Sequence, residues 1–136
     1  NFQRLIPKTI KSILEDVPPK MWGGKAIRDY LFIDDAIDAY LLLAKINTSK
    51  VGDNRVFNFG SSNMIGVEDL IKKIIKIVGK NLIIKKVSDE RKGEIASQYV
   101  SFNKAIRVLG WKPKISLDEG LRRTVAWYSK YLYNKE

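Results

Sequence analysis

Residues 27–44 read IRDYLFIDDAIDAYLLLA and place an apolar run directly before a helical pattern. Residues 27–33 are rich in Ile, Leu, Tyr and Phe, which favours a strand. Over residues 35–46, apolar side chains recur three and four positions apart, which predicts an amphipathic helix, at Ile37, Tyr40, Leu41 and Ala44. Neither pattern explains the polar pair Arg28 and Asp29 at the head of the strand.

Asp34 and Asp35 stand where the predicted helix begins. Either carboxylate can accept hydrogen bonds from the free backbone amides of a first helical turn, so we expect these residues to cap the helix. Two adjacent carboxylates are also a candidate general acid and base, but capping explains them more simply.

Outward from this stretch, helical and strand patterns alternate along the chain. Helical apolar stripes predict helices over 5–15, over 67–79, from about Asn103 to Gly110, and from 116 to the C-terminus. The runs RVFNFG at 55–60 and NLIIKKV at 81–87 are predicted strands, and MWGGKA at 21–26 is a predicted turn. Strands that feed helices indicate a mixed α/β fold.

Composition limits the function classes. The chain has 136 residues, 45% of them hydrophobic, which is enough for one buried core. It contains no cysteine and no histidine, which excludes disulfides, thiolate or imidazole metal ligands, and catalysis by either residue. No apolar run approaches the ~20 residues of a membrane span, and the N-terminus shows no signal-peptide pattern. We therefore expect a soluble, cytoplasmic protein that does not contact membranes.

The charge balance favours an anionic partner. Twenty-five Lys and Arg residues stand against fifteen Asp and Glu, a formal net charge of +10, and the basic excess is concentrated in residues 71–92. This basic stretch is either the solvated face of an amphipathic helix or a footprint for a polyanion such as nucleic acid. A nucleic-acid module is the less favoured alternative, because the aromatic residues near 30 and 57–59 lie in runs typical of buried strands. An assembly module joined through apolar helix faces is a further alternative.

Five segments occur in an order that identifies a family: RLIPKTIKSIL, IRDYLFIDDAIDAYLLLA, RVFNFGSS, GVEDLIKKIIKIVG and ERKGEIASQYVSFNKAIRVLGWKPKISLDEGLRRTVAWY. Over essentially its full length, the chain resembles the C-terminal part of the sugar-nucleotide epimerases and dehydratases of the extended short-chain dehydrogenase/reductase family. The resemblance implies that residues 1–136 are the substrate-binding portion. It also implies that a strand and helices of this portion complete the Rossmann-like sheet of a missing N-terminal half.

The resemblance also implies which parts of the chemistry lie elsewhere. Family members bind NAD or NADP through a glycine-rich loop and use a Tyr-x-x-x-Lys pair, and both belong to the N-terminal half. This sequence has no G-x-G-x-x-G loop, and its one Tyr-x-x-x-Lys match, Tyr131 with Lys135, lies in the C-terminal helix outside the family context. We therefore expect no cofactor site and no turnover from this chain alone. The resemblance further implies a parent enzyme that is a homodimer.

The resemblance gives Arg28 a role. In the family, the arginine of the R-D-Y motif reaches the diphosphate of a nucleotide sugar, a task suited to a planar guanidinium that binds phosphate oxygens in a bidentate manner. Arg91, in the RKGE segment, matches a second arginine that clamps the diphosphate. The alternatives are a surface Arg28 paired with Asp29 or Asp35, and a solvated loop at Arg91.

Further positions match the nucleotide side of the family's substrate site. Glu94 falls where an acidic residue accepts hydrogen bonds from ribose hydroxyls. Trp22 and Lys20 fall in the segment that runs along the base, and Arg4 with Leu5 falls in a further nucleotide-lining stretch. Trp22 is alternatively a core residue. The expected ligand is a UDP-, dTDP-, CDP- or GDP-linked sugar, and the expected parent activity is epimerisation or 4,6-dehydration.

Overall fold

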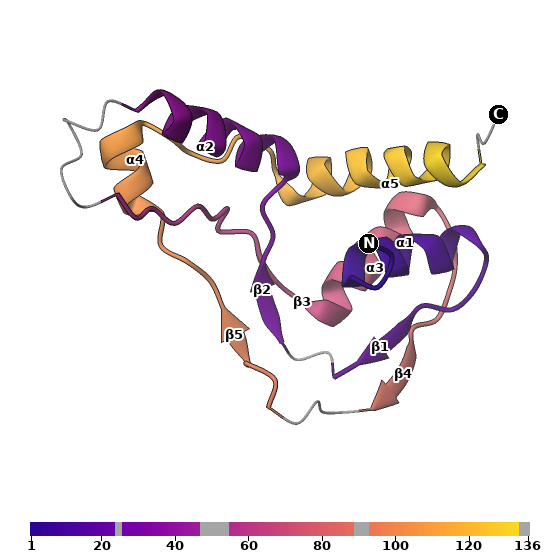
Figure 1. Cartoon of the computed structure of the whole chain (residues 1–136). Helices are drawn as coiled ribbons and strands as arrows, with labels where there is room; N and C mark the ends of the chain where they lie inside the picture. The colour runs from indigo at the N-terminus through magenta and orange to yellow at the C-terminus, as the bar shows by residue number, and fades with distance from the viewer. Residues whose placement is uncertain (24–25, 47–54, 89–92, 134–136) are drawn as a thin grey trace. The chain divides into compact units, whose positions relative to one another are not determined.

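Helices alternate with short strands in the computed structural model, which describes residues 1–23, 26–46, 55–88 and 93–133 (Figure 1). The elements are α1 (Leu5–Leu14), β1 (Lys20–Trp22), β2 (Ile27–Asp29), α2 (Ile33–Lys45), β3 (Met64–Gly66), α3 (Val67–Val78), β4 (Lys85–Ser88), β5 (Ser97–Gln98), α4 (Asn103–Leu109) and α5 (Leu117–Tyr133). The mixed α/β class and all of the predicted helices are confirmed. Within the described ranges, none of the helices combines the length and the apolar character that a membrane crossing requires.

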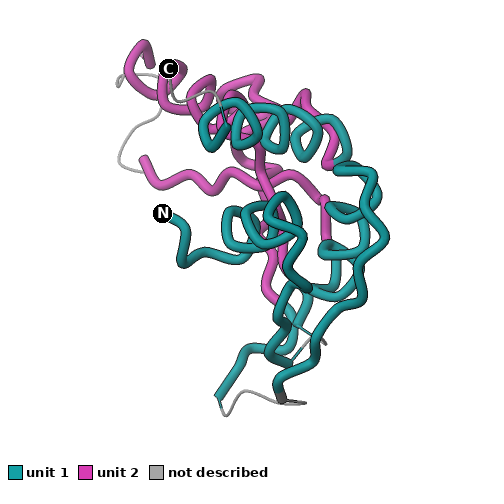
Figure 2. The backbone as a smooth tube through the Cα atoms, turned by 90° about the vertical axis from the view of Figure 1, so that its right-hand side faces the viewer, with its two compact units in different colours: residues 1–27, 65–97, 118–136 teal, residues 28–64, 98–117 magenta. Residues whose placement is uncertain are grey.

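The chain divides into two compact units (Figure 2). Unit 1 comprises residues 1–27, 65–97 and 118–136, and unit 2 comprises residues 28–64 and 98–117. Strands β2, β3 and β5 form one sheet in the order β3-β2-β5.

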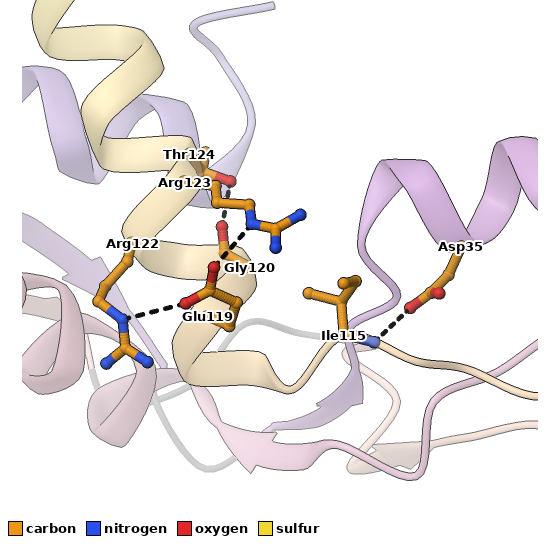
Figure 3. Close-up of polar contacts among 7 residues, drawn as sticks. All are labelled: Asp35, Ile115, Glu119, Gly120, Arg122, Arg123 and Thr124. Carbon is orange, nitrogen blue, oxygen red and sulfur yellow. Dashed lines mark hydrogen bonds and ion pairs between the residues drawn. The ribbon is translucent and has the colours of Figure 1, made fainter.

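Unit 1 is built on the packing of α1 against α3 and on the parallel pair β1–β4. Apolar residues three and four apart on the helices meet one residue of β1 in the core, which contains Ile10, Ile13, Met21, Leu70, Ile71, Ile74, Leu121 and Val125. In the first turns of α5, Glu119 accepts hydrogen bonds from Arg122 and Arg123 at 3.3 and 2.7 Å, and the Thr124 hydroxyl donates to the Gly120 carbonyl at 2.7 Å (Figure 3). Such pairs support a helix locally.

Unit 2 has a separate core around one tryptophan. Trp111 is buried with Ala39 of α2 and Ala105 of α4, and half-buried apolar side chains pack around them, namely Leu31, Phe57, Phe59, Phe102 and Leu109. The rings of Phe59 and Phe102 meet the Trp111 ring edge to face, with centroids 4.9 and 5.8 Å away. The predicted end of α4 is confirmed, because Gly110 adopts a left-handed conformation with φ of 66°.

The predicted strands differ most from the structure. The strand expected over 27–33 is only Ile27–Asp29, because α2 already begins at Ile33, and the strand expected over 81–87 is Lys85–Ser88. Within the described residues, 55–60 forms no strand. Its side chains do alternate, with Val56 and Asn58 exposed and Phe57 and Phe59 half-buried. A strand also needs a hydrogen-bonded neighbour, and the described chain supplies none here.

The predicted capping role of Asp34 and Asp35 is wrong for Asp35. The N-cap residue of α2 is Phe32, which makes no side-chain capping bond, and Asp35 lies inside the first turn. Its buried carboxylate instead accepts hydrogen bonds from the backbone amides of Lys114 and Ile115, each at 3.0 Å. Figure 3 shows the bond from Ile115. A contact across about eighty residues of sequence replaces the local one.

Candidate functional site

The predicted site residues are divided between the two units. Unit 1 holds five of the seven, Arg4, Leu5, Lys20, Trp22 and Glu94. Arg28 belongs to unit 2, and Arg91 lies outside the described residues. The convergence of Arg28 and Arg91 on one anion therefore stays a prediction.

Strand β1 presents two of the predicted side chains together. Successive side chains of a strand point to opposite faces, so Lys20 and Trp22 share one face while Met21 occupies the other. Met21 is 1% exposed and belongs to the core, whereas Trp22 is half-buried and Lys20 is exposed. Trp22 is therefore not a core residue of unit 1, and its face of β1 is accessible to a ligand.

Helix α1 reaches the same face through Lys8, a residue that the sequence reasoning missed. Its ammonium Nζ lies 4.4 Å from the ring centroid of Trp22, in a cation–π contact. Lys8 stands one turn beyond Arg4 and three positions beyond Leu5, so it lies on the helix surface next to both predicted residues. That spacing from Leu5 was the available signal.

Glu94 approaches the backbone that follows Trp22. A Cβ atom added at Gly23 would lie 2.8 Å from Glu94 Oε2, and Gly23 has a φ of +69°, in the region that favours glycine. A side chain at position 23 is thus excluded by both space and backbone conformation. The structure therefore brings Glu94 close to the end of β1.

In unit 2, Arg28 and Asp29 are successive residues of β2, so their side chains point to opposite faces of the strand, and Tyr30 follows directly after it. Burial raises the pKa of the Tyr30 phenol above its usual value, and the nearby positive charge of Arg28 opposes this rise. The carboxylates considered as surface partners of Arg28 both bind backbone amides. Asp29 accepts from the amides of residues 61 and 63, and Asp35 accepts from those of residues 114 and 115.

Within its described part, residues 71–88, the basic stretch is a solvated face. Several of its lysines form exposed ion pairs, namely Lys72 and Lys86 with Glu68, Lys73 with Asp118, and Lys80 with Asp16. Hydrogen bonding from Lys72, followed by the charges of Lys72 and Lys86, lowers the pKa of Glu68. These pairs favour the interpretation of a solubilising helix over that of a polyanion footprint.

Comparison with known proteins identifies the family of this chain. The family profile described as GDP-mannose 4,6 dehydratase matches residues 1–124. The chain belongs to this family. It is 32% identical to a dTDP-glucose 4,6-dehydratase of Haemophilus influenzae over 139 residues, which cover 93% of this chain and 40% of that protein. The resemblance to nucleotide-sugar epimerases and dehydratases of the extended short-chain dehydrogenase/reductase type is thereby confirmed.

Solved structures of the family agree. A UDP-glucose 4-epimerase of Thermotoga maritima with UDP-glucose matches with a TM-score of 0.85 and 32% identity, over 95% of this chain and 40% of that one. A UDP-glucuronic acid 4-epimerase of Bacillus cereus, in complex with UDP-glucuronic acid and NAD, matches with a TM-score of 0.81 and 28% identity, over 98% of this chain and 41% of that one. The chain thus spans about 40% of the length of these relatives.

The described residues do not fit the NAD that such relatives bind. A dinucleotide cradle needs a glycine-rich turn between a strand and a helix, and the β3–α3 junction carries one glycine, Gly66. The space beside Gly23 and Gly60 is filled by the side chains of Glu94, Asp29 and Val100 rather than left open for a pyrophosphate. The described residues also contain no group of three or more acidic side chains placed to hold a metal ion.

Proposed function

We propose that this chain binds the nucleoside-diphosphate part of a nucleotide sugar, as the substrate-side portion of an NAD-dependent 4-epimerase or 4,6-dehydratase. The relatives support the substrate class, because their names specify UDP-glucose, UDP-glucuronic acid and dTDP-glucose. The chain covers about 40% of their length. In this proposal, NAD and the proton-transfer pair belong to the remainder of the enzyme. Residues 55–60 then pair with the sheet of that remainder, and the complete enzyme is a homodimer.

The observation that carries the proposal is the gathering of nucleotide-binding chemistry at β1 of unit 1. The indole of Trp22 offers a flat apolar face to a base, and stacking of this kind tolerates any base. The ammonium groups of Lys8 and Lys20 offer donors to base carbonyls or phosphate oxygens on the same side of the strand. The Glu94 carboxylate beside Gly23 offers an acceptor to ribose hydroxyls.

Arg28 and Arg91 supply the diphosphate contacts in this proposal. A guanidinium presents parallel N–H donors to phosphate oxygens and stays charged at any physiological pH. Arg28 and Asp29 are successive residues of β2, so their side chains project to opposite faces of the strand. Arg91 stays a prediction from the sequence.

Calorimetric titration of the purified protein with UDP-glucose, dTDP-glucose, GDP-mannose and CDP-glucose tests the proposal. We expect Arg28→Ala and Arg91→Ala to weaken binding of the preferred sugar about tenfold or more, because a charge-assisted hydrogen bond contributes ~1.5–3 kcal/mol. Lysine at either position should restore little, because it lacks the bidentate geometry. Arg107→Ala, an exposed arginine of α4, is the matched control and should bind normally.

Two outcomes would contradict the proposal. Unchanged affinity in both alanine variants would show that the two arginines are surface charges. Full rescue by lysine together with a steep loss of binding in salt would indicate non-specific attraction to the basic surface. A parallel titration with single-stranded DNA identifies the nucleic-acid alternative, which requires tighter binding of DNA than of any nucleotide sugar.

A further inference from the structure

Asp29 is bound by a turn that comes thirty residues later in the sequence. The backbone amide of Ser61 donates to Asp29 Oδ2 at 3.0 Å, and the amide of Asn63 donates to Oδ1 at 3.2 Å. The Ser61 hydroxyl donates to Oδ1 as well, with the carbonyl of Tyr30 as its alternative acceptor at 2.8 Å. Three donors of one turn therefore converge on a single carboxylate of unit 2.

The turn is shaped to receive this carboxylate. A Cβ atom at Gly60 would lie 2.7 Å from Asp29 Oδ2, so only glycine lets the backbone approach so closely. The hydroxyl of Ser61 also accepts from the amide of Asn63 at 3.0 Å, which closes the turn on itself. Each oxygen of Asp29 accepts from a backbone amide of the turn, so a carboxylate satisfies both amides. An asparagine does not, because its NH₂ group would face one of the two N–H groups.

The position of Asp29 on β2 connects this turn to the proposed site. Strand β2 is three residues long, so its ladder hydrogen bonds alone fix its rotation weakly. Arg28 is the preceding residue of β2, so its side chain projects to the opposite face of the strand. The charge of its guanidinium also acts on the Tyr30 phenol. Rotation of β2 that released Asp29 from the turn would therefore also redirect Arg28.

We propose that Asp29 is a positioning residue for Arg28: its hydrogen bonds to the 61–63 turn fix β2 so that the guanidinium is presented to the diphosphate of the nucleotide sugar. The inference rests on the proposed function, in which Arg28 contacts that diphosphate. It assigns Asp29, Ser61 and the turn to substrate binding although none of them contacts the ligand.

A double-mutant cycle on the purified protein tests the inference, with UDP and dTDP as the probes. We expect Asp29→Asn to weaken binding of the preferred diphosphate about three- to tenfold, the range of coupling between residues in one network. In an Arg28→Ala background, the same substitution should change the affinity less than about twofold, because its effect runs through Arg28. Asp35→Asn is the matched control, since it also removes a carboxylate from backbone amides of unit 2 and should leave binding unchanged.

Ser61→Ala provides a second variant in case Asp29→Asn does not fold. It removes one of the three donors and keeps both amide bonds, so we expect it to weaken binding about two- to threefold, again only when Arg28 is present. Equal effects of Asp29→Asn or Ser61→Ala with and without Arg28 would overturn the positioning role while leaving the proposed function intact. Unchanged binding in Arg28→Ala itself would overturn the inference and the role of Arg28 in the proposed function, and unchanged binding in Arg91→Ala as well would overturn the proposed function.

Discussion

The indole N–H of Trp111 donates to the backbone carbonyl of Asp35, with 3.1 Å between nitrogen and oxygen. The carboxylate of the same aspartate accepts from the backbone amides of Lys114 and Ile115. One residue in the first turn of α2 thus binds the segment 111–115 through both its backbone and its side chain. Both Asp35 and Trp111 are buried, at 2% and 3% exposure, and the bond between them is buried as well, whereas the two bonds from residues 114 and 115 are partly buried.

Removal of the Asp35 carboxylate should destabilise unit 2. Asp35→Ala leaves two backbone amides without their acceptor, and each unsatisfied buried donor costs ~1–3 kcal/mol. We expect the free energy of unfolding to fall by about 2–4 kcal/mol in urea denaturation. Asp35→Asn should cost less, because the amide oxygen still satisfies one of the two donors.

Asp38→Ala is the control for this prediction. Its carboxylate pairs with the Lys114 ammonium at 2.6 Å, but the two side chains are 42% and 66% exposed. An exposed pair of this kind contributes little, so the unfolding midpoint should hardly change. Equal losses in the Asp35 and Asp38 variants would show that the position of α2 does not depend on the buried carboxylate.

The helices were predictable because their signal is local and long. Ten to seventeen residues with apolar positions three and four apart determine α1, α3 and α5 without knowledge of their partners. The strands were harder, because β1, β2, β3 and β5 have two or three residues each and depend on pairing with distant segments. Asp35 shows the same limit, since a cap and a long-range clamp are indistinguishable until residues 114 and 115 are placed.

The candidate site was predictable only in part, for a related reason. The motifs predicted site roles for Trp22, Lys20 and Glu94, which stay predictions, and the structure places Trp22 close to Lys8 and Glu94 close to Gly23. Lys8 was missed because a lysine on an amphipathic helix is ordinarily a solvated residue. Asp29 was considered only as a partner for its neighbour Arg28, whereas its partners are thirty-two and thirty-four positions away.

Gly60 should tolerate no side chain. A Cβ atom there would lie 2.7 Å from Asp29 Oδ2 and 2.8 Å from Val100 Cγ2, both of which must shift. We expect Gly60→Ala to lower the free energy of unfolding by about 1–3 kcal/mol, the usual cost of overpacking. It should also weaken nucleotide binding if the 61–63 turn positions β2.

Gly110 separates this steric effect from a purely conformational one. Its φ is +66°, and a Cβ atom at this position would meet no neighbouring atom within 4 Å, so only the left-handed backbone opposes a side chain. Gly110→Ala should therefore cost about 1–2 kcal/mol, and Gly110→Asn less, because asparagine tolerates this conformation. If Gly60→Asn also cost less unfolding free energy than Gly60→Ala, the steric explanation for Gly60 would be contradicted.

Asp118 should titrate below an ordinary aspartate. The Lys73 ammonium binds its carboxylate at 2.7 Å, and this hydrogen bond is the main reason that the pKa of Asp118 is lowered. The pKa of Asp118 is lower in the folded state than in the unfolded chain, so the pair with Lys73 stabilises unit 1 fully at pH values above the ordinary aspartate pKa of 3.8. That stability is lost as the pH falls through the folded-state value. Carboxyl NMR titration measures the pKa directly.

Substitution of Lys73 should return the pKa of Asp118 toward its usual value. Lys76→Met should have a smaller effect, since Lys76 makes the smallest of the contributions to the shift. High salt should reduce the difference between wild type and Lys73→Met, because both side chains are about half exposed, at 42% and 51%. An Asp118 pKa that does not respond to Lys73→Met would contradict the contact between α3 and α5.

Trp22 should report nucleotide binding through its fluorescence. The chain has three tryptophans, of which Trp111 is buried in unit 2 and Trp127 is stacked on Tyr131 on the surface of α5. Only Trp22 lies beside the candidate site, so titration with UDP or dTDP should change the emission of the wild type. Trp22→Phe should abolish that change, whereas Trp127→Phe, the matched control, should retain it.

Substitutions of Trp22 and Lys8 should also weaken nucleotide binding. Stacking of a base on an aromatic ring is worth ~1–3 kcal/mol, so Trp22→Ala should weaken binding about fivefold or more, and Trp22→Phe less. Lys8→Met removes the ammonium that lies 4.4 Å from the indole centroid and should weaken binding while leaving the fluorescence change in place. If Trp22→Phe keeps both the emission change and the affinity of the wild type, the base binds elsewhere, and the face of β1 that carries Lys20 and Trp22 is only a surface of unit 1.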